Sequence, residues 1–166
     1  MEIERLIDIR KIPLRIVHND TKINNLLFRN KSAVAVIDLD TVGPGIIFYD
    51  YGDALRTLAN TAAEDEKNIG LVGFNLDAFE SFTKAYLQQI ATSLNEKEKR
   101  LLYRAPILMT FIMGIRFLTD FLNGDVYYKT SYSEHNLSRT LVQKRYIELM
   151  EQSENKMKEI IHKYLT

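Results

Sequence analysis

The sequence predicts an α+β fold that is mainly helical, with a few short strands gathered near its N-terminus. The first third of the chain holds short, apolar and partly β-branched runs, which are typical of strands. From about residue 75 onward, apolar residues recur at three- and four-residue spacing, which is typical of amphipathic helices. The 166 residues contain no internal repeat, low-complexity segment or linker rich in Pro, Gly and Ser. We therefore expect a single domain, residues 1–166.

Three short strands are expected before residue 40, namely Leu14–Val17, Asn25–Phe28 and Ala33–Ile37. The polar run Arg29–Ser32 separates the second strand from the third, so these two should form a β-hairpin. Thr41–Gly45 contains two glycines and a proline, and we expect it to be a loop.

Helices are expected in the rest of the chain. Asp53 is a candidate N-cap for a helix from Ala54 to about Ala62. A second helical stretch, Glu96–Leu122, should be kinked or divided near Pro106, and a third should cover Asn136–Tyr164. The buried stripes of the helical regions after residues 75 and 135 are expected to be Leu76, Phe79, Phe82, Tyr86 and Ile90, and Leu137, Leu141, Tyr146, Leu149, Met157 and Ile160.

Composition excludes several classes of function. Lys+Arg and Asp+Glu are both 22, so the chain has no general attraction for nucleic acid or anionic lipid. It has no cysteine, which excludes disulfides and thiolate metal sites. Residues 1–10 lack the apolar core of a signal peptide, and the longest apolar stretch, Ala105–Ile115, is about half a bilayer span. We expect a cytoplasmic protein with no nucleic-acid or membrane partner.

One group of polar residues points to chemistry. Asp20 precedes the expected hairpin, Asn25 is its first residue, and Asp38 follows it, so their side chains should converge at its ends. Oxygen ligands of this kind suit Mg²⁺, which proteins bind through one or two carboxylates together with substrate phosphates. A zinc site is improbable because the three histidines, His18, His135 and His162, are widely separated.

These residues form a pattern that resembles a known family. H-x-D-x-x-x-x-N at residues 18–25, followed by an apolar strand ending in I-D-x-D at residues 37–40, is similar to the catalytic core of aminoglycoside phosphotransferases and choline kinases. Tyr49–Arg56 is similar to the segment that follows the metal loop in this family. Thr61–Glu66 and Phe121–Tyr127 most resemble the branch of N-acetylhexosamine 1-kinases. The matches run from about residue 14 to residue 140.

The resemblance implies the C-terminal lobe of a protein-kinase-like fold, with the catalytic and metal loops on its β-hairpin region. It also implies a role for each motif residue. Asp20 would orient the acceptor hydroxyl and accept its proton, while Asn25 and Asp38 would hold Mg²⁺ against the phosphates of ATP. His18 would brace the loop, and Asp50 would anchor it through backbone N–H groups.

The acceptor would meet residues further along the chain. Arg116 and Asp120 share a helix face, and either form a solvent-facing ion pair or reach into a cleft. Tyr127 suits a sugar because its ring packs on C–H groups while its hydroxyl forms hydrogen bonds. We expect Arg116 and Tyr127 to bind substrate ahead of Asp120 and Asp125. Asp40 would bind either substrate hydroxyls or a second metal.

The expected function is transfer of the γ-phosphoryl group of ATP to a sugar hydroxyl, most simply the anomeric O1 of an N-acetylhexosamine. The alternatives are a kinase for choline, homoserine or an aminoglycoside, and a catalytically idle module that binds sugar or nucleotide. The sequence does not distinguish the hexosamine, the nucleotide or the oligomeric state.

A nucleotide-binding lobe is not expected within these residues. Seventeen residues precede His18, and residues 1–42 contain no glycine for a phosphate-covering loop. Lys11 is too close to the catalytic loop to be the phosphate-contacting lysine of such a lobe. We therefore expect this chain alone to be weakly active or inactive. The surface that faces such a lobe should then promote self-association.

Overall fold

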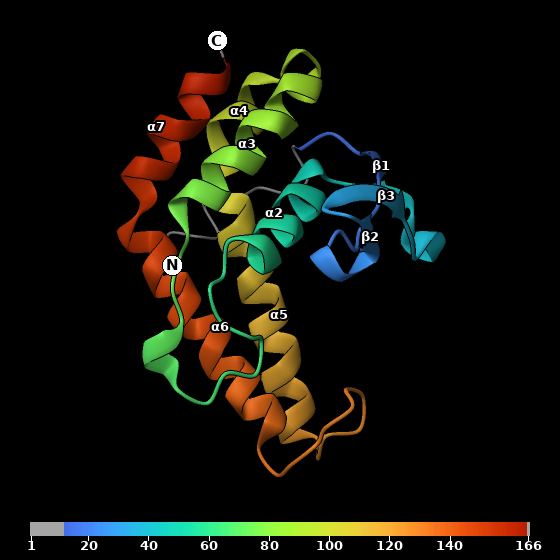
Figure 1. Cartoon of the computed structure of the whole chain (residues 1–166), viewed down its shortest axis with the longest axis vertical. Helices are drawn as coiled ribbons and strands as arrows, with labels where there is room; N and C mark the ends of the chain where they lie inside the picture. Colours follow the sequence, from blue (N-terminus) through green and yellow to red (C-terminus); the bar gives the residue numbers. More distant parts are fainter. Residues whose placement is uncertain (1–11, 166) are drawn as a thin grey trace.

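The computed structural model describes residues 12–165 and confirms a mainly helical fold with short antiparallel strands (Figure 1). The expectations for residues 1–10 and Lys11 concern residues outside this range. In chain order the elements are β1 (Arg15–Val17), β2 (Leu26–Arg29), β3 (Ser32–Val36), β4 (Gly43–Gly45), α2 (Ile47–Leu58), α3 (Leu76–Ile90), α4 (Glu96–Leu101), α5 (Ala105–Leu122), α6 (His135–Gln152) and α7 (Glu154–Leu165). The strands lie together at one side of the helices (Figure 1).

The strands form two antiparallel pairs. β2 and β3 make the expected hairpin, and its turn residues Asn30 and Lys31 both have positive φ, which suits a two-residue hairpin turn. The expectation of a plain loop at residues 41–45 is wrong in part, because β4 pairs with β1. The strands β1 and β4 approach closely there, since a Cβ on Gly45 would lie 2.4 Å from Val17 Cγ2. Glycine therefore permits this pairing.

Helix α2 begins earlier than expected. Its first residue is Ile47, and Asp53 lies inside the helix instead of capping it. Phe48, Tyr51 and Leu55 recur at three- and four-residue spacing and are fully buried, so they extend the helix upstream of Asp53. The helix packs tightly on the start of α5, where a Cβ on Gly52 would lie 2.3 Å from the Ala105 carbonyl oxygen.

Helix α3 follows the expected pattern. The side chain of Asn75 accepts a hydrogen bond from the Ala78 N–H and caps the helix. Phe79 is fully buried, while Phe82 and Tyr86 are partly buried and pack with Tyr51 of α2. This aromatic contact joins α3 to the helix that carries Asp50.

The helical stretch 96–122 is divided near Pro106, as predicted. α4 starts with a capping box between Asn95 and Glu98, and a 3-10 turn at residues 102–104 separates it from α5. Pro106 lies in the first turn of α5, where its missing N–H is not needed for a helical hydrogen bond. The division therefore lies just before the proline.

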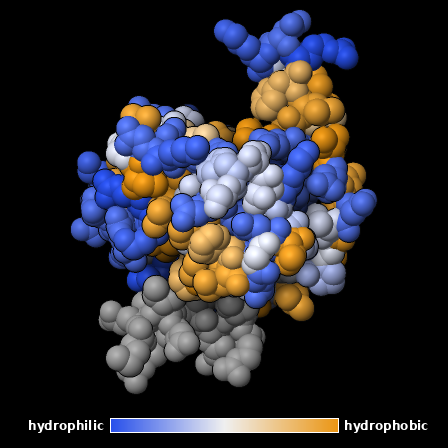
Figure 2. Space-filling model, turned by 90° about the horizontal axis from the view of Figure 1, so that it is seen from below, coloured by the Kyte–Doolittle hydropathy of each residue, from blue (hydrophilic) through white to orange (hydrophobic). Residues whose placement is uncertain are grey.

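Within the described residues, one helical run is long and apolar enough to span a membrane by length and composition, namely Glu96–Leu122. It is longer than the apolar stretch Ala105–Ile115 because it includes α4, the 3-10 turn and all of α5. α5 packs against α2 and α6 and buries Met109 and Phe117 in those contacts. On the face drawn in Figure 2, hydrophobic patches are interrupted by hydrophilic ones. The inner face of α5 therefore forms part of the hydrophobic core.

The C-terminal region holds two helices where one helical region was expected. α6 and α7 are separated at Ser153, and α6 packs on α5 while α7 packs on α3. The expected stripe is wrong in part, because Leu141 is 44% exposed. The fully or nearly fully buried apolar positions are Val142, Tyr146, Met150, Met157 and Ile161. The shift arises because each helix turns its own face inward after the break.

Candidate active site

The segment after β1 is held in place by Asp50 of α2. The backbone N–H groups of His18 and Asn19 donate hydrogen bonds to the two carboxylate oxygens of Asp50, each at 2.8 Å. The Thr21 hydroxyl donates to the Asp50 carbonyl oxygen at 2.6 Å. Hydrogen bonds to an ionised carboxylate are stronger than neutral ones, so this contact fixes the loop on the helix. This is the geometry expected of an anchor.

Asp20 lies on this loop between two donors. Lys22 Nζ is 2.6 Å from Asp20 Oδ2, and Asn25 Nδ2 donates to the same oxygen at 2.9 Å. Asn25 Nδ2 also donates to the Asp20 carbonyl oxygen at 2.8 Å. Partial burial by itself raises the pKa of Asp20, but the hydrogen bonds from Lys22 and Asn25 outweigh it and hold the pKa below its usual value. Asp20 is therefore ionised at neutral pH.

The pH dependence of any reaction that needs ionised Asp20 follows from this. The folded pKa lies below the unfolded value of about 3.9, so the ionised form and its stabilising contacts are present above that value. They are lost as the pH falls through the folded pKa. We expect the acid limb of the pH profile of kcat/KM to lie below about pH 4.

Lys22→Met removes the ammonium group, so it should raise the pKa of Asp20 and move the acid limb to higher pH. Lys84→Met, on the exposed face of α3, is the matched control and should leave the limb in place. Profiles of kcat/KM against pH for the three proteins test this. An acid limb at the same pH in Lys22→Met would contradict the assignment of Asp20 as the titrating group.

The hairpin brings Asp38 next to this loop. The Ile37 N–H donates to the Asn25 carbonyl oxygen at 3.0 Å, so Asp38 directly follows the residue paired with Asn25. Asp38 is exposed and has a left-handed backbone (φ 62°). His18 Nε2 lies 3.3 Å from the Ile37 carbonyl oxygen, and the Thr41 hydroxyl donates to the His18 carbonyl oxygen at 2.6 Å. His18 therefore connects the two loops.

Asn25 and Asp38 offer the kinds of ligand atom that a magnesium ion binds. The amide nitrogen of Asn25 is engaged by Asp20, which turns the amide oxygen away from those contacts, and Asp38 offers a carboxylate. Both are hard oxygen ligands of the kind Mg²⁺ prefers. Among the described residues no group of three or more His, Cys, Asp or Glu side chains is arranged to hold a metal. A site of this composition would thus depend on the phosphates of a nucleotide for further ligands.

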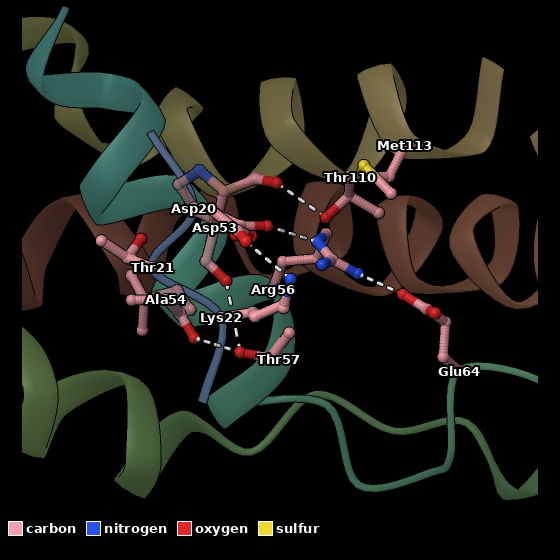
Figure 3. Close-up of polar contacts among 12 residues, drawn as sticks. Asp20, Thr21, Lys22, Asp53, Ala54, Arg56, Thr57, Glu64, Thr110 and Met113 are labelled. Carbon is pink, nitrogen blue, oxygen red and sulfur yellow. Dashed lines mark hydrogen bonds and ion pairs between the residues drawn. The ribbon is translucent and has the colours of Figure 1, made fainter. Parts of the chain in front are cut away.

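A buried ion network lies beside the loop (Figure 3). Arg56 Nε donates to Asp53 Oδ1 at 2.7 Å, and Arg56 Nη1 donates to Glu64 Oε1 at 2.7 Å. Arg56 and Asp53 are buried, whereas the side chain of Glu64 is 42% exposed. Burial by itself lowers the pKa of Arg56, but the carboxylates of Asp53 and Glu64 outweigh burial and raise the pKa above its usual value. The guanidinium therefore stays charged.

Arg116 and Tyr127 lie together at the far end of α5. The Arg116 guanidinium carbon is 5.8 Å from the ring centre of Tyr127 and 5.6 Å from that of Tyr128. Tyr127 is 73% exposed. In Figure 1 the segment that joins α5 to α6 lies at the lower end of the molecule, away from the β-hairpin. Within residues 12–165, no hydrogen bond, ion pair or ring contact joins Arg116 or Tyr127 to Asp20.

The structure gives Asp120 a structural role, which fits neither an exposed ion pair with Arg116 nor a place in a cleft. It is buried, and its carboxylate accepts hydrogen bonds from the N–H groups of Tyr127 and Tyr128 and from the Asn136 side chain. Burial by itself raises the pKa of Asp120, but these bonds outweigh it and lower the pKa. Asp125 shares the Asn136 amide. Asp40, by contrast, lies exposed in a 3-10 turn after Asp38.

Four residues of the site region were not singled out from the sequence. Lys22 pairs with Asp20, and its position two residues later on the loop was a usable signal. Arg56 and Glu64, eight residues apart, meet Gln143 from a distant part of the chain around one cavity. Their spacing carries no local signal, so only the fold brings them together.

The chain is similar to a known protein family. The model of the family described as "Phosphotransferase enzyme family" matches residues 2–85, just over half of the chain. The matched range includes Asp20, Asn25, Asp38 and Asp50.

Proposed function

The chain belongs to the phosphotransferase enzyme family, and from this premise we propose that it supplies the catalytic lobe of a small-molecule kinase with a protein-kinase-like fold. The transferred group is the γ-phosphoryl group of ATP, and the acceptor is a sugar hydroxyl, the anomeric O1 of an N-acetylhexosamine. The observation that carries the proposal is the Asp20 carboxylate, held ionised by Lys22 and Asn25 on a loop anchored by Asp50.

Each residue has a physical task in this proposal. Asp20 accepts a hydrogen bond from the attacking hydroxyl, orients its oxygen and takes its proton. An ordinary carboxylate suffices because phosphoryl transfer has a loose transition state, in which positioning and charge stabilisation dominate. Lys22 places a positive charge beside Asp20, where charge on the transferred group develops.

Asn25 and Asp38 would hold Mg²⁺, which neutralises charge on the phosphates when it is bound. His18 keeps the loop that carries Asp38 close to Asn25 through its contact with the Ile37 carbonyl oxygen. Asp40, exposed on the same loop, would meet either acceptor hydroxyls or a second metal ion.

Two further proposals concern the rest of the enzyme. Residues 12–42 contain no glycine for a phosphate-covering loop, so this part of the chain does not supply such a loop to the proposed kinase. The hairpin exposes Leu27, Phe28, Val34 and Val36, each between 46% and 54% exposed, and this apolar surface promotes self-association when no lobe covers it. We also propose a cytoplasmic location, without nucleic-acid or membrane partners, for this neutral chain.

Phosphoryl transfer tests the proposed function directly. The chain, and any longer protein that contains it, would be incubated with Mg·ATP and N-acetylglucosamine, N-acetylgalactosamine, glucose, choline, homoserine and an aminoglycoside. We expect transfer to the N-acetylhexosamines above all others. Transfer to choline, homoserine or the aminoglycoside instead would replace the acceptor but keep the kinase. No transfer by either protein would overturn the kinase proposal in favour of an idle binding module.

A further inference from the structure

A groove lies between α4 and α7. Its volume is about 740 Å³, within the range of about 300–1,000 Å³ that is usual for ligand pockets. Its walls come from α4, from the 3-10 turn that follows α4, and from α7. In Figure 1, α7 lies on the left of the molecule, whereas the strands lie on the right. No residue that lines the groove belongs to the Asp20 loop or to the hairpin.

The groove concentrates positive charge in a chain whose formal net charge is zero. Lys97, Lys99 and Arg100 line it from α4, and Lys158 lines it from α7. Glu96 is the only carboxylate among the lining residues. This local excess of cations favours an anionic ligand.

Two of these cations are available to such a ligand. Lys99 pairs with Glu96 at 2.9 Å, and Lys158 pairs with a glutamate of its own helix. Within residues 12–165, the side chains of Lys97 and Arg100 have no hydrogen-bond or ion-pair partner. Arg100 is exposed and Lys97 is partly exposed, so a carboxylate that enters the groove can reach both.

The base of the groove is apolar. It is formed by Tyr103 and Ile161, which are mostly buried, and by Leu165, which is partly exposed. The ammonium nitrogen of Lys158 lies 4.6 Å from the ring centre of Tyr103, so the aliphatic part of this lysine also covers the base. A bare anion would leave this apolar surface in water. The groove therefore favours a ligand that carries both negative and apolar groups.

Both walls of the groove are held in place. α4 begins with the capping box of Asn95 and Glu98, and the buried Glu98 carboxylate accepts two hydrogen bonds from Arg15, each at 2.8 Å. α7 is tied to α3, because the Tyr164 hydroxyl donates to the Glu80 carboxylate at 2.7 Å. A preformed groove loses less conformational entropy when it binds a ligand.

The arrangement favours a peptide over a membrane surface. Helices that bind a bilayer insert exposed apolar side chains between the lipids. Here Tyr103 and Ile161 are only 8% and 4% exposed and lie at the base of a recess, where a bilayer does not reach them. A peptide can enter the recess with an apolar side chain and keep its carboxylates at the rims.

We propose that the groove between α4 and α7 is a docking site for an acidic peptide segment of a partner protein, in which apolar residues stand between carboxylates. The apolar side chains pack on Tyr103 and Leu165, and the carboxylates pair with Lys97 and Arg100. The proposal does not depend on the proposed phosphoryl transfer, because the groove shares no residue with the Asp20 loop.

Fluorescence anisotropy tests the chemistry of the ligand. The probe is the fluorescein-labelled peptide EEFLEE, and the controls are EESSEE, which lacks the apolar pair, and KKFLKK, which reverses the charge. We expect EEFLEE to bind this chain at least about tenfold more tightly than either control, and to bind more weakly as salt screens the charges. Equal binding of the two acidic peptides, or no binding of EEFLEE, would overturn the proposal.

A double substitution tests the position of the site. Lys97→Gln/Arg100→Gln removes the two unpaired cations and should raise the Kd of EEFLEE about tenfold. Arg29→Gln/Lys31→Gln removes the same two charge types from the exposed hairpin turn and should leave the Kd unchanged. Thermal unfolding shows whether both variants are folded. An unchanged Kd in a folded Lys97→Gln/Arg100→Gln variant would refute the assigned groove.

NMR locates the peptide without a substitution. During titration with EEFLEE, we expect the amide signals of residues 97–103 and 158–165 to shift. Shifts confined to the apolar hairpin, residues 26–36, would place the peptide elsewhere and overturn the proposal.

Two further measurements separate this inference from its alternatives. Binding to vesicles that contain phosphatidylserine, without binding of EEFLEE, would replace the peptide with anionic lipid and overturn the proposal. In the transfer assay, Lys97→Gln/Arg100→Gln should keep the wild-type rate. If no polypeptide shows transfer but EEFLEE binds as expected, the proposed kinase fails and the docking site stands.

Discussion

Asp20→Asn is expected to lower kcat for phosphoryl transfer by about 10²–10⁴-fold, the usual contribution of a positioned general base. Asparagine has nearly the same shape as aspartate but cannot accept the hydroxyl proton. It can still receive hydrogen bonds from Lys22 and Asn25, which now contact Asp20 at 2.6 and 2.9 Å. The loop should therefore stay in place while the chemistry is lost.

The measurement is the rate of ADP and phosphosugar formation under saturating Mg·ATP and acceptor, in the polypeptide that shows transfer. Asp77→Asn, an exposed aspartate in the first turn of α3, is the matched control and should keep the wild-type rate. Circular dichroism would show that both variants are folded. A kcat within threefold of wild type in Asp20→Asn would refute the role assigned to this carboxylate.

Asp53→Ala is expected to produce the largest loss of stability, about 3–5 kcal/mol in the free energy of unfolding. The substitution leaves the guanidinium of Arg56 buried while removing its inner partner at 2.7 Å. Glu64, the outer partner of the same guanidinium, has a side chain that is 42% exposed, and Glu64→Ala should cost less than about 1 kcal/mol. The two variants remove the same type of group from the same arginine at different depths.

Urea unfolding monitored by far-UV circular dichroism tests this pair. The midpoint should fall strongly for Asp53→Ala and little for Glu64→Ala, with unchanged slopes. Replacing the arginine as well, in Asp53→Ala/Arg56→Leu, removes the unpaired buried charge and should recover part of the loss. Equal midpoints for the two single variants would show that burial of Arg56 does not control the energy of this network.

Local sequence signals predicted the hairpin and the division of the long helical stretch, because each depends on residues close together in the sequence. The Arg29–Ser32 break gave the hairpin, and Pro106 gave the division of the long helical stretch before α5. The start of α2 was missed because Asp53 resembled an N-cap. In the fold it serves as the buried partner of Arg56, a role that no sequence window reveals. The β1–β4 pairing was missed because it joins segments on either side of the hairpin.

The site residues likewise differ in whether local sequence could predict their surroundings. Asp20, Asn25 and Asp38 were recognised because they occupy fixed spacings around one hairpin, and Asp20 and Asn25 are hydrogen-bonded in the structure. Asp120 was expected either to form a solvent-facing ion pair with Arg116 or to reach into a cleft, because the two residues share a helix face. The loop after α5 instead folds back onto its carboxylate, which buries it. Spacing along a helix gives the face of a residue but not what covers that face.

The sequence by itself determined that this chain is mainly helical and carries Asp20, Asn25 and Asp38 around one hairpin, because periodicity and spacing are local properties. Only the tertiary structure decided which residues surround these three. Lys22, Arg56, Glu64 and Gln143 come from three separate parts of the chain, and the packing of α2 and α6 against α5 brings them to one cavity. Contacts between distant segments depend on the whole core, so no local pattern specifies them.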